Sequence, residues 1–116
     1  MQQSEGKIQQ EIVKWFRNNY CLRHHSPRCI IQSVPNESKS KQETLVKLAM
    51  GILPGASDLL VVLPGIVLFV EVKRPGEKPR QNQCEYRDTV TVLGFRYEVV
   101  TSLEEFQSLI TFFLNK

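Results

Sequence analysis

The sequence predicts an α/β fold in which helices flank a mixed central sheet, in the order α-β-α-β-β-α-β-α. Apolar residues recur with helical spacing near both ends of the chain. Two apolar runs joined by Pro64-Gly65 indicate a β-hairpin in the middle. A chain of 116 residues is long enough for one hydrophobic core, so we expect a single domain over residues 1–116.

The first half of the chain is predicted to hold a helix, a strand and a second helix. The first helix covers about Glu5 to Tyr20, and its inward side chains recur every four residues: Ile8, Ile12, Phe16 and Tyr20. A strand covers about Arg28 to Val34, and Pro35 ends it. The second helix covers about Ser40 to Met50 and ends at Gly51. Its inward residues are predicted to be Leu45, Leu48 and Ala49.

The apolar runs Leu59 to Leu63 and Ile66 to Lys73 are predicted to pair as the antiparallel strands of the hairpin. Neither run alternates between apolar and polar residues. That pattern is typical of strands that are buried on both faces. We therefore expect helices to cover both faces of this part of the sheet.

The remainder of the chain is predicted to hold a helix, a strand and a last helix. The helix covers about Pro79 to Leu93 and ends at Gly94, and the strand covers about Arg96 to Val100. The run from Ser102 to Glu105 is a capping box. It begins a last helix whose apolar side chains are Leu103, Phe106, Leu109, Ile110 and Phe113.

The composition excludes several classes of protein. With 41% hydrophobic and 23% charged residues, the chain is neither disordered nor fibrous. Its longest uncharged apolar stretch, Leu59 to Val70, has 12 residues, whereas about 20 are needed to cross a bilayer. The first ten residues lack the apolar core of a signal peptide, and the three cysteines lack zinc-ligand spacing. We therefore expect a cytoplasmic protein with reduced thiols and no membrane segment.

Three ionisable residues are predicted to meet at one end of the hairpin. Glu71 and Lys73 interrupt the most apolar strand and project from the same face of it, because they stand at positions i and i+2. Asp58 directly precedes the partner strand, so it lies beside the end that carries Glu71 and Lys73. Two close carboxylates repel each other, and a divalent cation removes that conflict. Carboxylates are usual ligands of Mg²⁺ and Mn²⁺, ions that promote phosphodiester hydrolysis.

These residues, in this order, resemble the PD-(D/E)xK nuclease superfamily and, within it, the stand-alone VRR-NUC (virus-type replication-repair nuclease) domain of phages and bacteria. The resemblance covers Ser4 to about Leu114 and implies a restriction-endonuclease-like core. It is carried by Ser4-Glu5-x-x-Ile8-Gln9, Pro35-Asn36-Glu37, Gly55-x-x-Asp58, Glu71-Val72-Lys73 and Gln83. Ser57 replaces the proline that usually precedes the aspartate in the family, which predicts a less rigid loop.

The resemblance implies a catalytic set of five residues: Glu5, Asp58, Glu71, Lys73 and Gln83. Asp58 and Glu71 would bind Mg²⁺ or Mn²⁺ directly, and Val72 would add its backbone carbonyl. Glu5 would complete the metal site directly or through water. Lys73 would be the catalytic lysine, which orients or deprotonates the attacking water or holds the scissile phosphate, and Gln83 would assist from the following helix.

Two acids compete for the place on the first helix. Glu5 lies three residues before Ile8 and seven before Ile12, and it therefore shares their inward face. Glu11 has Lys14 and Asn18 at the same spacings, which is typical of a solvated face. We favour Glu5 and keep Glu11 as the alternative.

The sequence shows no recognition helix or zinc finger that would read bases, so we expect recognition of DNA shape, such as branches, flaps or junctions. The resemblance also implies branched DNA, and we expect four-way (Holliday) junctions first. Six basic residues outside the predicted strands are expected to contact phosphates: Lys39, Lys41, Lys47, Lys78, Arg80 and Arg87. Cutting both strands of a junction needs two active sites, which predicts a homodimer. The last helix, with Phe112, Phe113 and Leu114, is expected to contribute to its interface.

Two other functions remain open from the sequence. One is a non-catalytic DNA-binding or assembly module that keeps the nuclease fold. The other is an α/β interaction protein in which the Glu-x-Lys pattern is accidental. The presence of Glu5, Asp58, Glu71 and Lys73 together favours the nuclease, because a non-catalytic module is free to lose them.

Overall fold

A computed structural model of the chain describes residues 3–36 and 39–115. Its eight elements occur in the predicted order, and their ends lie within two residues of the predicted ones. They are α1 (Glu5–Tyr20), β1 (Ile30–Ser33), α2 (Lys41–Ala49), β2 (Leu59–Leu63), β3 (Ile66–Val72), α3 (Gln81–Val92), β4 (Arg96–Val100) and α4 (Leu103–Leu114).

The strands form one mixed sheet in the order β1-β2-β3-β4. β1 and β2 are antiparallel, β2 and β3 form the predicted antiparallel hairpin, and β3 and β4 are parallel. The parallel pair requires a crossover connection between its strands, and α3 provides it. The predicted α/β class, with a mixed sheet flanked by helices, is confirmed.

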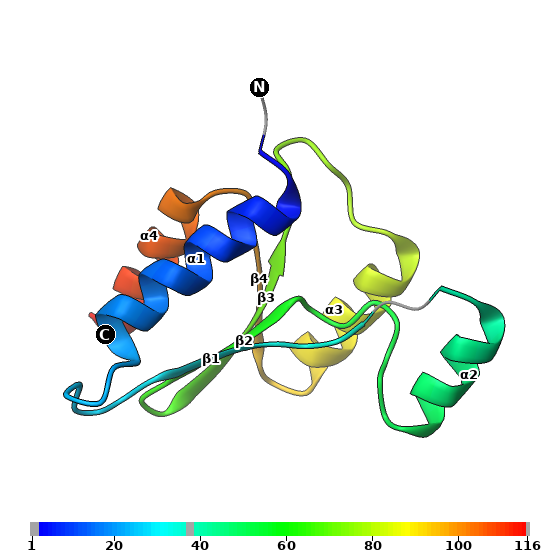
Figure 1. Cartoon of the computed structure of the whole chain (residues 1–116), viewed down its shortest axis with the longest axis horizontal. Helices are drawn as coiled ribbons and strands as arrows, with labels where there is room; N and C mark the ends of the chain where they lie inside the picture. Colours follow the sequence, from blue (N-terminus) through cyan, green and yellow to red (C-terminus); the bar gives the residue numbers. More distant parts are fainter. Residues whose placement is uncertain (1–2, 37–38, 116) are drawn as a thin grey trace.

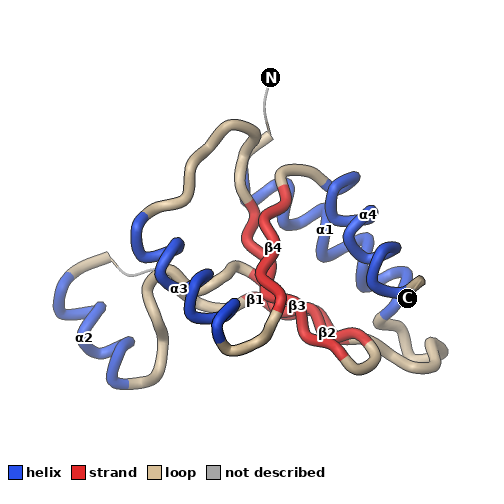
Figure 2. The backbone as a smooth tube through the Cα atoms, turned by 180° about the vertical axis from the view of Figure 1, so that it is seen from behind, coloured by secondary structure: helices blue, strands red, loops and turns tan. Residues whose placement is uncertain are grey.

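α1 and α4 lie together on one face of the sheet, and α3 lies on the other (Figures 1 and 2). The core is formed between the sheet and the pair α1–α4. Its buried apolar side chains include Ile8, Ile12 and Phe16 from α1, Val61, Leu68, Val70 and Val72 from the strands, and Phe106 and Ile110 from α4. The inward spacing predicted for the first and last helices is therefore confirmed at these residues.

The other face of the hairpin is only partly covered. Phe69 of β3 packs beside Tyr86 of α3, with 6.3 Å between ring centroids. Leu60 and Val62 of β2 remain half-buried, because α3 lies over the β3–β4 side of the sheet. The expectation that helices cover both faces completely is wrong for this part of β2.

The second helix is the other departure from the predicted fold. No described residue of α2 is buried, and Leu45 and Leu48, predicted to point inward, are 67% and 42% exposed. α2 stands away from the sheet (Figure 1). The apolar residues of α2 do recur with helical spacing, but none of its side chains reaches the core of the chain.

The remaining expectations concern the last helix, the thiols and the membrane. Phe113 and Leu114 pack against the core, so only Phe112, at 48% exposure, projects clearly from the end of α4. The three cysteines are free thiols, as predicted. Within residues 3–36 and 39–115, no helix has the length and apolar character needed to cross a membrane.

Candidate active site

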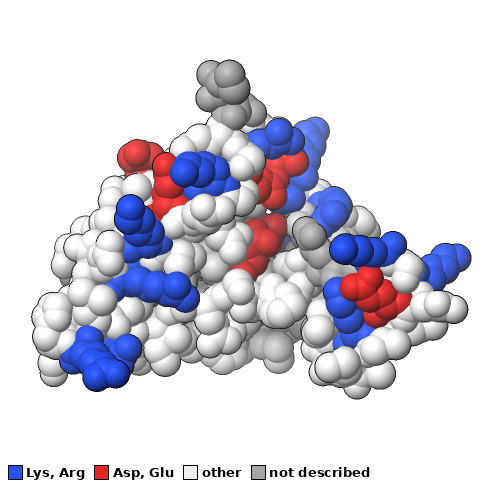
Figure 3. Space-filling model, viewed as in Figure 1, with Lys and Arg blue, Asp and Glu red and all other residues white. Residues whose placement is uncertain are grey.

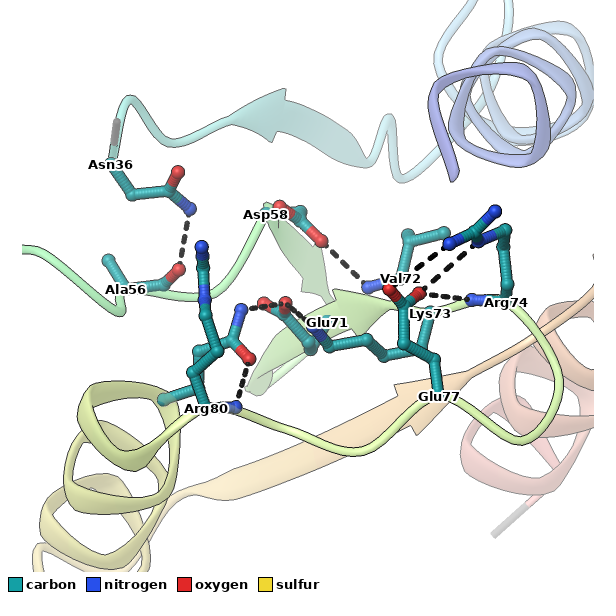
Figure 4. Close-up of polar contacts among 10 residues, drawn as sticks. Asn36, Ala56, Asp58, Glu71, Val72, Lys73, Arg74, Glu77 and Arg80 are labelled. Carbon is teal, nitrogen blue, oxygen red and sulfur yellow. Dashed lines mark hydrogen bonds and ion pairs between the residues drawn. The ribbon is translucent and has the colours of Figure 1, made fainter. Parts of the chain in front are cut away.

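The register of the hairpin brings Asp58 and Glu71 together. Leu59 pairs with Val70, so the next positions outward on the two strands are Asp58 and Glu71. The backbone N–H of Val72 donates a hydrogen bond to Asp58 Oδ2 at 2.8 Å, which holds the Asp58 carboxylate against the end of β3 (Figure 4). Asp58 and Glu71 therefore lie beside each other at one end of the hairpin, as the sequence predicts.

Glu71 and Lys73 project from the face of β3 opposite the main core, at the end where β3 meets the following loop (Figure 4). Both are buried, at 2% and 5% exposure, and Lys73 Nζ lies 3.9 Å from Glu71 Oε2. Val70 and Val72 are buried in the core on the other side of the strand, as the alternation of side chains requires. At this distance the ion pair is weak, so Lys73 compensates only part of the free-energy cost of burying the Glu71 carboxylate.

Gln83 ties the start of α3 to Glu71. Its side-chain Nε2 donates to Glu71 Oε2 at 2.8 Å, and its Oε1 accepts from the backbone N–H of Arg80 at 2.8 Å. The side chain is buried, so both ends of its amide are satisfied inside the protein. Gln83 therefore both caps α3 and fixes the orientation of the Glu71 carboxylate. It is more than one of several polar residues at the start of a helix, which its sequence neighbours alone would suggest.

A close backbone contact positions the loop that carries Asp58. Gly55 has φ +86°, and a Cβ placed on it would stand 2.4 Å from the backbone oxygen of Asn82 in α3. Only glycine fits at this contact. Ser57 is completely buried, and its hydroxyl lies 3.5 Å from the backbone oxygen of Leu59, to which it donates. The loop is thus packed against α3 on one side, with Ser57 at the position before Asp58.

Glu5 reaches the site from the first turn of α1. It lies close enough to Lys73 and Asp58 for their charges to act on its carboxyl, and it shares a hydrogen bond with the carboxyl of Glu77. Burial, followed by this hydrogen bond, raises the pKa of Glu5. Glu11, the competing acid, accepts a hydrogen bond from the exposed Gln3 side chain.

Glu77 is a site residue that the sequence analysis missed. It follows a turn in which Gly76 has φ +82°, and its backbone N–H bonds to the carbonyl of Arg74 at 3.1 Å. Hydrogen bonds from Glu5 and from Arg74, whose guanidinium lies 3.5 Å away, lower the pKa of Glu77 to about 2. The spacing Arg74–Glu77 was a signal for the ion pair, but the path of the turn toward Glu5 has no signature in the sequence.

The electrostatics of the site centre on Glu71. Burial and then the charge of Asp58 raise the pKa of Glu71 to about 8, against a smaller lowering effect of Lys73. Tyr97 of β4 was also missed by the sequence analysis, and its pKa is raised by burial and by the charges of Glu71 and Asp58. A carboxyl group in this position holds its proton near neutral pH unless a cation replaces that proton.

The residues fit a hard divalent cation. Glu71 Oε1 is buried and has no hydrogen-bond partner within the described residues, which leaves a strong acceptor available to an ion. In residues 3–36 and 39–115, no group of three or more His, Cys, Asp or Glu side chains is arranged to hold a metal. Mg²⁺ is commonly held by only one or two carboxylates and keeps several waters. Asp58 and Glu71 supply two such carboxylates.

The six predicted phosphate-binding residues are spread over α2, α3, the loop between β3 and α3, and position 39 just before α2. Arg80 stands at the start of α3, and its side chain extends toward the side of the site where Asn36 and Asp58 lie (Figure 4). Lys47 and Arg87 form ion pairs with Glu43 and Asp88, at 2.7 and 3.1 Å. The other three are exposed: Lys39, Lys41 and Lys78.

No family model and no curated protein matches the chain. Solved structures do match it over nearly its whole length. One, titled "VRR_NUC domain", is 27% identical and superposes with a TM-score of 0.62, covering 92% of this chain and 94% of that chain. Another, titled "VRR_NUC domain protein", is 17% identical with a TM-score of 0.73, covering 96% of this chain and 88% of that chain. At the lower identity the likeness is one of fold.

Proposed function

Because the chain has the fold of a VRR-NUC domain, we propose that it is a metal-dependent endonuclease that hydrolyses phosphodiester bonds in branched DNA, with four-way junctions as the first substrate. One observation carries this proposal. Glu71 is buried beside Asp58 and Lys73 with its Oε1 lacking a hydrogen-bond partner in the described residues. A fold that needed this position only for packing gains nothing from a carboxylate that destabilises it.

Asp58 and Glu71 would hold Mg²⁺ or Mn²⁺, with the carbonyl of Val72 as a third ligand and Glu5 directly or through water. The bound ion supplies Lewis-acid stabilisation of the negative charge on phosphate and an acidified water. Gln83 keeps the Glu71 carboxylate aimed into the site through its 2.8 Å hydrogen bond. Lys73 orients or deprotonates the attacking water, or holds the scissile phosphate, from a position 3.9 Å from Glu71.

The proposed substrate class rests on the basic residues of the chain. Lys39, Lys41, Lys78 and Arg80, together with Lys47 and Arg87, are proposed to contact phosphates, which positions DNA without reading its bases. Discrimination would then rest on the shape of the DNA, which is why a branched substrate is proposed over a base sequence.

A homodimer is proposed because symmetric cutting of a junction needs two sites. The chain leaves apolar side chains exposed that a second copy can cover: Leu45, Val46, Leu48 and Met50 around α2, Leu93 and Phe95 after α3, and Phe112 on α4. Light scattering at micromolar concentration tests this, and a monomeric mass would refute it. We propose that the protein acts in the cytoplasm of a bacterial or phage-infected cell.

The test is cleavage of labelled four-way junction, flap and plain duplex in Mg²⁺ or Mn²⁺, with EDTA as the metal control. Lys73→Met keeps the aliphatic stem of the buried lysine and removes its charge, while Lys7→Met removes an exposed charge from α1 as a matched control. We expect the first variant to lose at least about a hundredfold in rate and the second to cut normally. Binding by the wild type without cutting in either metal would favour the non-catalytic module.

A further inference from the structure

A groove between α1 and β1 begins beside the candidate site. It encloses about 660 Å³ and starts at Gly6, the residue after Glu5. Lys14 and Arg17 of α1 line it together with side chains that carry amide or hydroxyl groups: Gln9, Gln10, Asn18, Gln32 and Ser33. Among the described residues that line the groove, none is Asp or Glu. The groove is therefore positively charged and rich in hydrogen-bond donors.

The groove continues beyond its first cavity. A second cavity of about 610 Å³ shares Arg17 and Ile31 with the first and adds Arg28, again with no acidic residue among the described residues that line it. Figure 3 shows Lys and Arg side chains along α1 and the connection after it, with acidic side chains beside the uppermost of them, on the same face as a central hollow that contains further acidic side chains. Cations thus extend away from the acidic site in one direction.

The length of the groove suits a nucleic-acid backbone. From Gly6 to Arg17 the helix rises by roughly 17 Å, which is about five base-pair steps of duplex DNA. Lys14 and Arg17 are exposed on α1, and the structure gives neither a carboxylate ion pair among the described residues. Amide side chains between such cations donate further hydrogen bonds to phosphate oxygens.

We infer that the α1–β1 groove is a second DNA-binding surface, which holds the phosphate backbone of one duplex arm as it leaves the active site, through Lys14 and Arg17 and then Arg28. This inference rests on the proposed function, because it takes the site beside Glu5 as the place where the scissile phosphate lies. A duplex extends on both sides of any bond that is cut. The basic residues on α2 and α3 would hold one side, and the α1–β1 groove holds the other.

Removing positive charges from the groove tests whether they contribute to DNA binding. Binding of a fluorescein-labelled four-way junction and a 20-base-pair duplex is measured by anisotropy in EDTA, where no cutting occurs, at several salt concentrations. Lys14→Ala/Arg17→Ala should weaken binding by about tenfold or more at 0.1 M salt and reduce the slope of log K against log salt by about 2. Arg17→Ala alone should weaken binding more than Arg96→Ala, which removes an exposed arginine of β4 that pairs with Glu98.

A substitution at Gly6 tests the groove itself. Gly6 is exposed, and a Cβ on it meets no atom within 4 Å, so a side chain can start there without a clash. Gly6→Leu should fill the site end of the groove and weaken DNA binding, whereas Gly6→Ala should bind like the wild type. Both should raise the melting temperature, because each replaces a helical glycine, and this separates a blocked groove from a damaged fold.

The outcomes separate this inference from the proposed function. Unchanged affinity and salt slope in Lys14→Ala/Arg17→Ala would overturn the groove, whatever the wild type does to DNA in Mn²⁺. Intact binding that depends on the groove, without cleavage in either metal, would overturn the nuclease and leave the groove standing. If the wild type binds polyglutamate and no DNA, the groove is a site for an acidic protein and the inference is wrong.

Discussion

Replacing Glu71 by glutamine should stabilise the metal-free protein at neutral pH. The carboxyl of Glu71 has its ordinary pKa of 4.5 in the unfolded chain and a pKa of about 8 in the native protein, mainly because it is buried. Since the native pKa is raised, the stability that this group contributes is present below pH 4.5 and is lost as the pH rises through 8. Glutamine has nearly the same shape, carries no charge, and still accepts the hydrogen bond from Gln83.

The size of the effect follows from that shift. The free-energy cost of keeping the native carboxyl protonated is under about 1 kcal/mol at pH 5 and roughly 3 kcal/mol at pH 7. Glu71→Gln avoids this cost, so its stability advantage over the wild type should grow by about 2 kcal/mol between these pH values. For a domain of this size, that growth corresponds to roughly 10 °C in melting temperature.

The assay is urea unfolding in EDTA at pH 5 and pH 7, followed by the fluorescence of Trp15. This residue packs against the core, with its ring 6.1 Å from that of Phe106. Glu85→Gln is the matched control, because Glu85 is exposed on α3 and its hydrogen bond from Gln81 survives as an amide contact. An advantage of equal size at both pH values, or a loss of stability at both, would refute the reasoning. Added Mn²⁺ should stabilise the wild type and not the variant.

Three further predictions concern the parts that hold the site together. Gln83→Ala removes the hydrogen-bond partner of Glu71 and of the Arg80 N–H, so it should lower the free energy of unfolding by about 1–3 kcal/mol. Urea titration measures this change, and the rate of DNA cleavage should also fall. Gly55→Ala forces a Cβ against the backbone of Asn82 at a positive φ, so it should lower the free energy of unfolding by at least about 2 kcal/mol. Calorimetry measures this loss, and an unchanged stability would contradict the close contact. Mn²⁺ binding should tighten by about tenfold from pH 6 to 7 and less steeply from pH 7 to 8, since the ion must displace one proton from Glu71, whose pKa is about 8. Titration calorimetry at three pH values checks this, and a pH-independent affinity would show that Glu71 does not bind the ion.

Local patterns in the sequence were enough to predict the strands and the centre of the site. Pro64-Gly65 fixed the hairpin, and an antiparallel hairpin leaves no freedom about which residue faces which. Asp58 and Glu71 therefore had to meet once the hairpin was recognised. The inward spacing of Ile8 and Ile12 likewise predicted the face of α1 on which Glu5 lies.

What the sequence could not predict depends on the paths of loops. α2 has an apolar spacing like that of a packed helix, yet Leu45 is 67% exposed, because α2 stands away from the sheet. Glu77 reaches Glu5 only through the course of the β3–α3 turn. Periodicity shows that a helix has an apolar side, but it does not show whether another element lies against that side.

The incomplete cover on the α3 face has a consequence for the site. Glu71 and Lys73 are buried by the packing of α3 and its Gln83, which removes water and strengthens the interactions among their charges. On the neighbouring β2, Leu60 stays half-buried because no described helix lies over it. A helix packed there would also close the approach to Asp58, whose carboxylate stands at the end of the hairpin. The cover that is missing from this part of the sheet thus leaves Asp58 only half-buried at the end of the hairpin, whereas Glu71 is buried.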